Sequence, residues 1–164
     1  MEKPVLQIEN SYGNRIRVRV CGICLREGKI LLVNHKLYLN HDFWSPPGGG
    51  LEFGETASEA VEREVREETG LLVKVENFLF VEEYVNPPLH TVEIFFQCNV
   101  VSGELCKGID PEFRTEDQII SEVKWMTLED LNSVKPEARH AIFSSLTTWD
   151  NFLKRKGFSG YIIN

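Results

Sequence analysis

Alternating apolar and polar positions predict strands in several parts of the chain. The stretch IRVRVCGIC at 16–24 has the period of two that is typical of a strand buried on one face. A turn at REGK leads into a second expected strand at 30–33. Apolar runs predict further strands at 71–84, at 90–101 and over EVKWM at 122–126. The chain is therefore expected to form a sheet.

Breaks in this pattern predict loops. Residues 34–47, NHKLYLNHDFWSPP, read as a loop with aromatic content. A bulge or turn is expected near 76–77, inside a predicted strand. The NPP at 86–88 should end that strand, because proline cannot donate to a sheet ladder. Residues 102–120 hold glycines, a proline and acidic residues, and they predict a long surface loop of the kind that is often functional.

Two helices are expected after the last predicted strand. Thr127 can act as the N-cap of the first, with Asp130 three residues on. Pro136 suits the first turn of a last helix over about 137–155. Strands on both sides of an earlier helix, with a helix at the end, indicate a mixed α/β or α+β fold. The length of 164 residues suits one domain spanning 1–164.

The earlier helix, at 57–69, is crowded with glutamates and follows the segment PPGGG. Thr56 and Glu59 have the spacing of a capping box, and Gly70 stands where a helix stop belongs. Glycines let the backbone come close to a ligand, so PPGGG could offer a carbonyl to a metal or N–H groups to a phosphate. A simple turn and a glutamate-rich surface helix are the plainer alternatives for each segment alone.

One stripe of this helix begins with small and apolar residues and ends with carboxylates. At about 100° per residue, its members are Ala57, Ala60, Val61, Glu64 and Glu68, with Glu67 and Val65 at its two edges. Three carboxylates that face the protein body are costly unless something neutralises them, and they raise one another's pKa values. A divalent cation would resolve both problems, because hard oxygen ligands suit Mg²⁺ or Mn²⁺.

The opposite side of the helix carries mixed charges. Glu59 and Arg63, and likewise Glu62 and Arg66, have the favourable i,i+4 spacing for ion pairs. We therefore expect this side to be an ordinary solvated face.

Composition excludes several classes of function. The net charge is −7 and there is no run of Lys and Arg, so non-specific binding to DNA or RNA is not expected. There is no apolar stretch near the ~18 residues of a membrane span, and MEKPVLQIEN at the N-terminus lacks the apolar run of a signal peptide. A cytoplasmic location is the default expectation.

Cysteine usage raises the question of a metal or redox site. Cys21 and Cys24 form a CxxC, but Cys98 and Cys106 are separated by seven residues and do not supply a second tight pair for zinc. We expect ordinary small residues of a sheet with reduced thiols.

The glycine–helix segment resembles the full Nudix box. Gly49, five further residues, Glu55, seven further residues and then REVREETGL at 63–71 fill every fixed position of that motif. CLREGKILLV, FWSPPGGGLEFGE and SEVKWMTLEDL are also similar to segments of the family. The resemblance covers roughly residues 15–135. It implies an α/β/α sandwich around a mixed sheet, and Mg²⁺-dependent hydrolysis of the diphosphate linkage of a nucleoside diphosphate joined to a group X.

The resemblance also assigns roles to residues of the box. Glu64, Glu67 and Glu68 would be the metal carboxylates, and the carbonyl of Gly48 would be a further ligand. Arg63 would orient a box glutamate through a charge-assisted hydrogen bond.

The resemblance also implies a role for Glu55 and for the loop that follows the last long predicted strand. Glu55 would hold the geometry between loop and helix. The general base would be either Glu64 or an acidic residue in PEFRTEDQ, where Glu116 is favoured over Glu112 and Asp117 by position.

Residues outside the box would select the substrate. Phe43 and Tyr84 are candidates for contact with a base or ribose, although packing is an alternative for both. Arg114 could pair with a terminal phosphate, although a solvated loop residue is the favoured alternative for it. Pro87, 16 residues past the box, resembles the branch of the family that hydrolyses ADP-ribose, whereas small nucleotide hydrolases of the MutT type remain equally open. Dimers are common in the family, so a homodimer is left open.

Proteins that share this fold can have other functions. An isoprenoid diphosphate isomerase would need a catalytic cysteine and a second acidic set, which we do not identify. A nucleotide-sensing or RNA-binding domain is the alternative function, but such domains usually lose box carboxylates, which this chain keeps. Decapping of RNA is disfavoured by the acidic charge.

Overall fold

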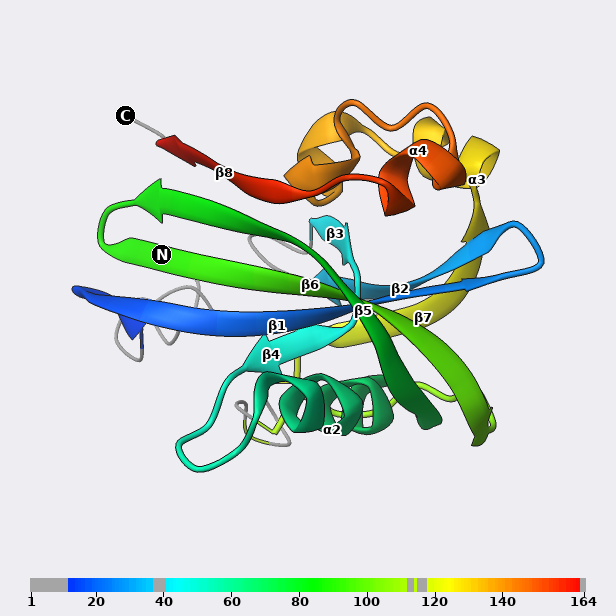
Figure 1. Cartoon of the computed structure of the whole chain (residues 1–164), viewed down its shortest axis with the longest axis horizontal. Coiled ribbons are helices and arrows are strands. Elements are labelled where there is room, and N and C mark those ends of the chain that lie inside the picture. The colour runs from blue at the N-terminus through cyan, green and yellow to red at the C-terminus, as the bar shows by residue number, and fades with distance from the viewer. Residues whose placement is uncertain (1–11, 37–40, 112–113, 115–117, 163–164) are drawn as a thin grey trace.

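A mixed eight-stranded sheet forms the centre of the computed structural model, which describes residues 12–36, 41–111, 114 and 118–162 (Figure 1). The strands and helices are β1 (Arg15–Arg26), β2 (Lys29–Lys36), β3 (Asp42–Ser45), β4 (Gly48–Gly50), α2 (Ala57–Thr69), β5 (Leu71–Asn86), β6 (Leu89–Gly103), β7 (Ile120–Thr127), α3 (Leu128–Ser133), the 3₁₀ turns η3 (Pro136–Ala138) and η4 (Ala141–Phe143), α4 (Trp149–Leu153) and β8 (Gly157–Ile162). The strand order is β3-β2-β1-β6-β5-β8, with β4 paired to β1 and β7 paired to β2.

Helices cover both faces of this sheet, as expected for an α/β/α sandwich. Helix α2 lies on one face, and the segment from α3 to α4 lies on the other (Figure 1). Strand β1 runs parallel to β6 and β8 runs parallel to β5, whereas the other pairs are antiparallel. Among the described residues, none of the helices combines the length and the apolar character that crossing a bilayer requires.

The core has one cluster on each side of the sheet. Phe80, Phe95 and Phe143 belong to the cluster that faces the C-terminal segment, and Val61 and Val65 belong to the cluster that faces α2. The two residues of the CxxC are divided between these clusters, with Cys21 in the first and Cys24 in the second. Both carry free thiols, so the structure supports the interpretation of these cysteines as packing residues.

The signals at the ends of the helices are confirmed. Thr56 and Glu59 form a reciprocal capping box, and helix α2 ends at Gly70, whose φ is 73°. Thr127 and Asp130 form a second capping box at the start of α3. The bulge predicted near 76–77 is a register shift between Val75 and Asn77 in β5.

Burial along β1 differs from the half-buried pattern that was predicted. Ile16 and Val18 are 63% and 37% exposed, whereas all residues from 20 to 24 are buried on both faces. Only the second half of β1 lies between α2 and the C-terminal segment. The alternation in sequence therefore marks the strand but not its buried face.

The loop predicted at 34–47 is wrong for most of its described residues. Strand β2 continues to Lys36, β3 pairs with β2 through Asn34 and Trp44, and Gly48 at the start of β4 pairs with Cys21. The segment lacks a regular alternation of apolar and polar residues, but the neighbouring strands supply the hydrogen bonds that hold it. The indole of Trp44 is buried, which ties β3 to the core.

The single C-terminal helix predicted at about 137–155 is also wrong. The segment instead forms η3, η4, α4 and then β8. Side chains that bond to nearby backbone divide it: His140 accepts from the N–H of Ile142, and Thr148 accepts from that of Asn151. Such local bonds compete with a continuous helix.

Candidate active site

The glycines of β4 lie directly against the glutamates of α2. The backbone N–H of Gly48 donates to Oε2 of Glu68 over 2.9 Å. A Cβ at Gly49 would lie 2.3 Å from the carboxylate of Glu64, so only glycine permits this approach. The sequence segment PPGGG therefore brings backbone, rather than side chains, to the carboxylates.

Two of the carboxylates are buried at this contact, as the helix stripe predicted. Glu64 and Glu68 are 5% and 1% exposed, whereas Glu67 lies at the edge and is half-buried. Burial raises the pKa of Glu64 to about 7 against the hydrogen bond from Arg63, and the nearby charge of Glu68 adds to the rise. A site that makes a carboxyl this reluctant to ionise is one in which a bound cation would be stabilising.

Arg63 joins the helix to the loop that precedes it. Its guanidinium donates to Glu55 over 2.8 and 3.2 Å, to Oε1 of Glu64 over 2.8 Å and to Oε2 of Glu67 over 3.1 Å. It also donates to the carbonyl of Gly50 over 3.1 Å. One side chain thus fixes the positions of three carboxylates and one strand.

The solvated ion pairs predicted for the outer face of α2 are not the ones that form. Arg63 turns to Glu55 and away from Glu59, because the loop before the helix folds back to meet it. Glu62 pairs with Lys74 of β5 over 2.7 Å in place of Arg66. Helical periodicity predicted which side of the helix these residues occupy, but it could not predict that their ion-pair partners come from other elements.

A second arginine holds the carbonyl side of β4. Arg19 of β1 donates from Nη2 to the carbonyl of Gly48 over 3.0 Å and from Nε to Oε1 of Glu93 over 3.1 Å. The other carboxylate oxygen of Glu93 lies 2.8 Å from Nε2 of His140. Burial by itself would raise the pKa of Glu93, but His140 and Arg19 together lower it to about 2. The network connects the C-terminal segment to the backbone of the glycine strand.

We predict that Glu93→Gln lowers the free energy of unfolding by about 3 kcal/mol at pH 7, because it removes the buried carboxylate charge that Arg19 and His140 contact. Since the folded-state pKa of Glu93 is depressed, its contribution is present above the unfolded pKa of 4.5 and is lost as pH falls toward about 2. Urea unfolding at pH 7 and pH 3 should therefore show the difference between variant and wild type shrinking at pH 3 by about 2 kcal/mol.

Glu83→Gln is the matched control on the neighbouring strand β5, because Glu83 forms a more exposed pair with His90. It should cost less than about 1 kcal/mol at either pH. A cost of Glu93→Gln that is the same at both pH values would contradict the assigned network.

The loop after β6 closes the C-terminal end of α2. Its N–H groups donate to the last carbonyls of the helix, from Cys106 to Thr69 over 2.9 Å, from Gly108 to Glu68 over 2.9 Å and from Ile109 to Glu67 over 3.2 Å. A Cβ at Gly108 would lie 1.8 Å from the carbonyl oxygen of Glu67, so glycine is required there. The first part of the predicted functional loop is therefore packed against the box.

This packing brings two residues to the glutamates that the sequence did not single out. His35, near the end of β2, has Nε2 3.4 Å from Oε1 of Glu68, and Asp110 of the loop lies beside them. The sequence pattern placed His35 in a loop, where nothing marked it. A signal for Asp110 was available in Gly108, since a glycine in a loop can mark close backbone contact.

The other predicted site residues lie on separate elements. Phe43 is half-buried on β3, with its ring centroid 6.2 Å from that of His140. Tyr84 is half-buried on β5, and its hydroxyl accepts from Asn86 over 2.8 Å. Arg114 is exposed in the loop before β7. The structure therefore brings together the box residues, and it places Phe43 opposite His35 in the pairing of β2 and β3. Glu112, Glu116 and Asp117 lie outside the described residues.

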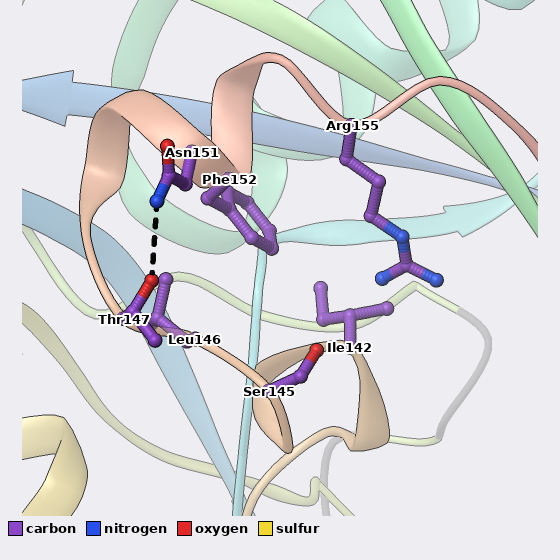
Figure 2. Close-up of a pocket in the computed structure, with 7 residues that line it drawn as sticks. All are labelled: Ile142, Ser145, Leu146, Thr147, Asn151, Phe152 and Arg155. Atoms are coloured by element: carbon purple, nitrogen blue, oxygen red, sulfur yellow. Dashed lines mark hydrogen bonds between the residues drawn. The ribbon is translucent and has the colours of Figure 1, made fainter.

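Cavities lie in two places among the described residues. The larger one, about 320 Å³, lies in the C-terminal segment, and Figure 2 shows Arg155 beside Ile142 and Phe152 in its wall. Arg155 is engaged there by Glu82 and Ser159. We attribute this cavity to the packing of that segment.

The smaller cavity, about 270 Å³, adjoins the box. It is lined by the segment that leads into β1, by the N-terminal part of β1, and by the end of β4 with the residues after it, namely Tyr12, Arg15, Ile16, Arg17, Val18, Gly50, Leu51 and Glu52. The guanidinium of Arg17 lies 3.9 Å from the centre of the Tyr12 ring. Its arginines and its aromatic ring suit a ligand that is both anionic and planar.

Known proteins share both the sequence and the fold. The NUDIX domain family matches residues 13–147. An ADP-ribose pyrophosphatase of Methanocaldococcus jannaschii is 42% identical over 95 residues, which are 57% of this chain and 56% of that protein. A MutT-like protein of Streptomyces ambofaciens is 37% identical over 52% of this chain and 53% of its own length. The chain spans about half the length of the curated relatives it matches.

Solved structures agree with the sequence match. A MutT NUDIX hydrolase of Burkholderia pseudomallei superposes with a TM-score of 0.57 at 27% identity, over 71% of this chain and 86% of its own. A NUDIX hydrolase of Nitrosomonas europaea gives 0.64 at 18% identity, over 90% of this chain and 79% of its own, which bears on the fold alone.

Proposed function

The chain belongs to the Nudix family, and from that premise we propose that it hydrolyses the diphosphate linkage of a nucleoside diphosphate joined to a second group, with Mg²⁺ as cofactor. The observation that carries this proposal is the burial of Glu64 and Glu68 against the backbone of β4. Buried carboxylates beside a backbone carbonyl supply the oxygen ligands that Mg²⁺ prefers.

The donor set fits such an ion. Glu64, Glu67 and Glu68 offer carboxylate oxygens, and Gly48 offers its carbonyl, which Arg19 already orients. The raised pKa of Glu64 supports this assignment, because a nearby dication would favour its ionised form. When bound, Mg²⁺ would offset the charge of the diphosphate and make a bound water more acidic.

Residues of the chain would position the metal ligands and supply the general base. Arg63 holds Glu64 and Glu67 in place, so that neither has to reorganise when substrate binds. Glu116 is the proposed general base, and Glu64 is the alternative within the box. The pH profiles of kcat for Glu116→Gln and Glu64→Gln distinguish the two candidates. Only loss of the residue that acts as the general base should remove the limb of the profile in which that base titrates.

The second group of the substrate is proposed to be ribose, so that ADP-ribose is the first candidate. Two observations support it: relatives named ADP-ribose pyrophosphatase match this chain, and Pro87 stands 16 residues past the box. The cavity beside the box holds Arg15, Arg17 and Tyr12, whose charges and aromatic ring suit an adenosine phosphate.

A panel of substrates with Mg²⁺ tests this proposal. It would hold ADP-ribose, NADH, diadenosine polyphosphates, nucleotide sugars and nucleoside triphosphates, with products separated by chromatography. We expect ADP-ribose to give AMP and ribose 5-phosphate with the highest kcat/KM. Turnover of nucleoside triphosphates alone would move the chain to the MutT type, and binding without turnover of any of them would favour a nucleotide-sensing role.

A further inference from the structure

Three ligand-type side chains from different elements meet at the C-terminal end of α2. They are His35 of β2, Glu68 of α2 and Asp110 of the loop after β6, and their ligand atoms lie within 4.8 Å of one another. His35 and Glu68 are buried, and Asp110 is half-buried. Two of the three lie outside the box, so this group extends the site beyond the carboxylates considered above.

His35 is held so that one ring nitrogen faces the two carboxylates. Its Nδ1 lies 3.3 Å from Oγ of Ser45, a residue of the adjacent strand β3. Its Nε2 lies 3.4 Å from Oε1 of Glu68. A histidine that binds a metal usually donates its other ring N–H to a fixed acceptor, and Ser45 can serve as that acceptor. In that tautomer the lone pair of Nε2 points to the carboxylates.

Asp110 is held from its backbone. Its N–H donates to Oε1 of Gln118 over 2.7 Å, and Nε2 of Gln118 donates to its carbonyl over 2.8 Å. On its other side, the bonds from Gly108 and Ile109 fix the chain to the end of α2. The position of Asp110 is therefore set on both sides, which is the preorganisation that a binding site needs.

The electrostatics of this place favour a cation. Glu68 lies in the last turn of α2, where the helix dipole is negative, and Asp110 adds a second carboxylate. A divalent cation bound by all three groups would offset the charge of both carboxylates.

We propose that His35, Glu68 and Asp110 bind a divalent transition-metal cation of the Mn²⁺, Fe²⁺ or Zn²⁺ class, in addition to the Mg²⁺ of the box. The imidazole decides the class, because Mg²⁺ strongly prefers oxygen ligands whereas these ions accept nitrogen and oxygen together. The proposal rests on the proposed function only in that Glu68 would be shared between the two ions. The bound cation would tie the loop after β6 to the box helix.

The test is electron spin echo spectroscopy of the full chain loaded with MnCl₂, which detects nitrogen bound to Mn²⁺. We expect a ¹⁴N modulation in wild type, its loss in His35→Gln, and Mn²⁺ binding at this site weakened at least about tenfold. His90→Gln is the matched control, since His90 pairs with Glu83 on the surface of β6 and β5. No ¹⁴N signal in wild type, or a signal that persists in His35→Gln, would overturn the proposal.

Asp110→Asn provides a second variant that leaves His35 intact. It should weaken Mn²⁺ binding at the same site while circular dichroism and thermal unfolding of the metal-free protein stay near wild type. Unchanged Mn²⁺ affinity in this variant would also overturn the proposal. Turnover with Mg²⁺ is measured in parallel. Activity without ¹⁴N coupling would contradict the second metal site and support the proposed function. ¹⁴N coupling without activity would support the metal site and contradict the proposed function.

Discussion

Glu68→Gln is expected to lower kcat with Mg²⁺ by about 10³-fold, since a metal ion supplies several kcal/mol of charge stabilisation that the variant would lose. Glutamine keeps the length of the side chain and an oxygen that can accept from the N–H of Gly48. The fold should therefore persist while the negative charge is removed. Steady-state kinetics with the substrate selected by the panel, over a range of Mg²⁺ concentrations, measures the effect.

Glu62→Gln is the control on the same helix, because Glu62 pairs with Lys74 on the outer face of α2. Its kcat should stay within about twofold of wild type, as expected for an exposed pair. If Glu68→Gln turned over normally at saturating Mg²⁺, Glu68 would not be a ligand of the catalytic ion, and the assignment of the box residues would fail.

Arg63→Lys is expected to lower kcat by about 10² -fold, at the upper end of the effect of residues that orient metal ligands. The planar guanidinium donates at once to Glu55, Glu64 and Glu67, whereas one ammonium group cannot reach all of them. Glu64 and Glu67 would then have to find their positions in each catalytic cycle. The measurement is kcat together with the Mg²⁺ concentration at half-maximal rate, which should rise.

Arg66→Lys serves as the control for this change, since Arg66 is exposed three residues further along the same helix. We expect its kinetics and its thermal unfolding to match wild type. A loss of activity in Arg63→Lys that is accompanied by unfolding, with normal kinetics in the fraction that stays folded, would make Arg63 a stability residue only.

The box helix could be predicted from the sequence because its signals are local. The cap at Thr56, the stop at Gly70 and the stripe that ends in Glu64 and Glu68 depend on residues within a few turns of one another. Such short-range rules need no knowledge of the rest of the fold. The same holds for the capping box at Thr127.

The parts that the sequence did not predict depend on partners far along the chain. Strand β3 forms because β2 lies beside it, and Glu62 finds Lys74 rather than Arg66 because β5 passes the helix. His35 reaches Glu68 across 33 positions. Amino-acid propensity and periodicity contain no information on such pairings, so the loop predicted at 34–47 and the ion pairs predicted for the outer face of α2 were wrong for the same reason.

The last strand has a consequence for the handling of this protein. Strand β8 pairs along β5 from Phe80 to Val85 and so forms the outermost strand on that side of the sheet. A chain shortened before Gly157 would leave the backbone N–H and C=O groups of β5 open along this stretch. Open edges of that kind recruit strands from other molecules. Removal of a few C-terminal residues would therefore favour aggregation even though every residue of the box is kept.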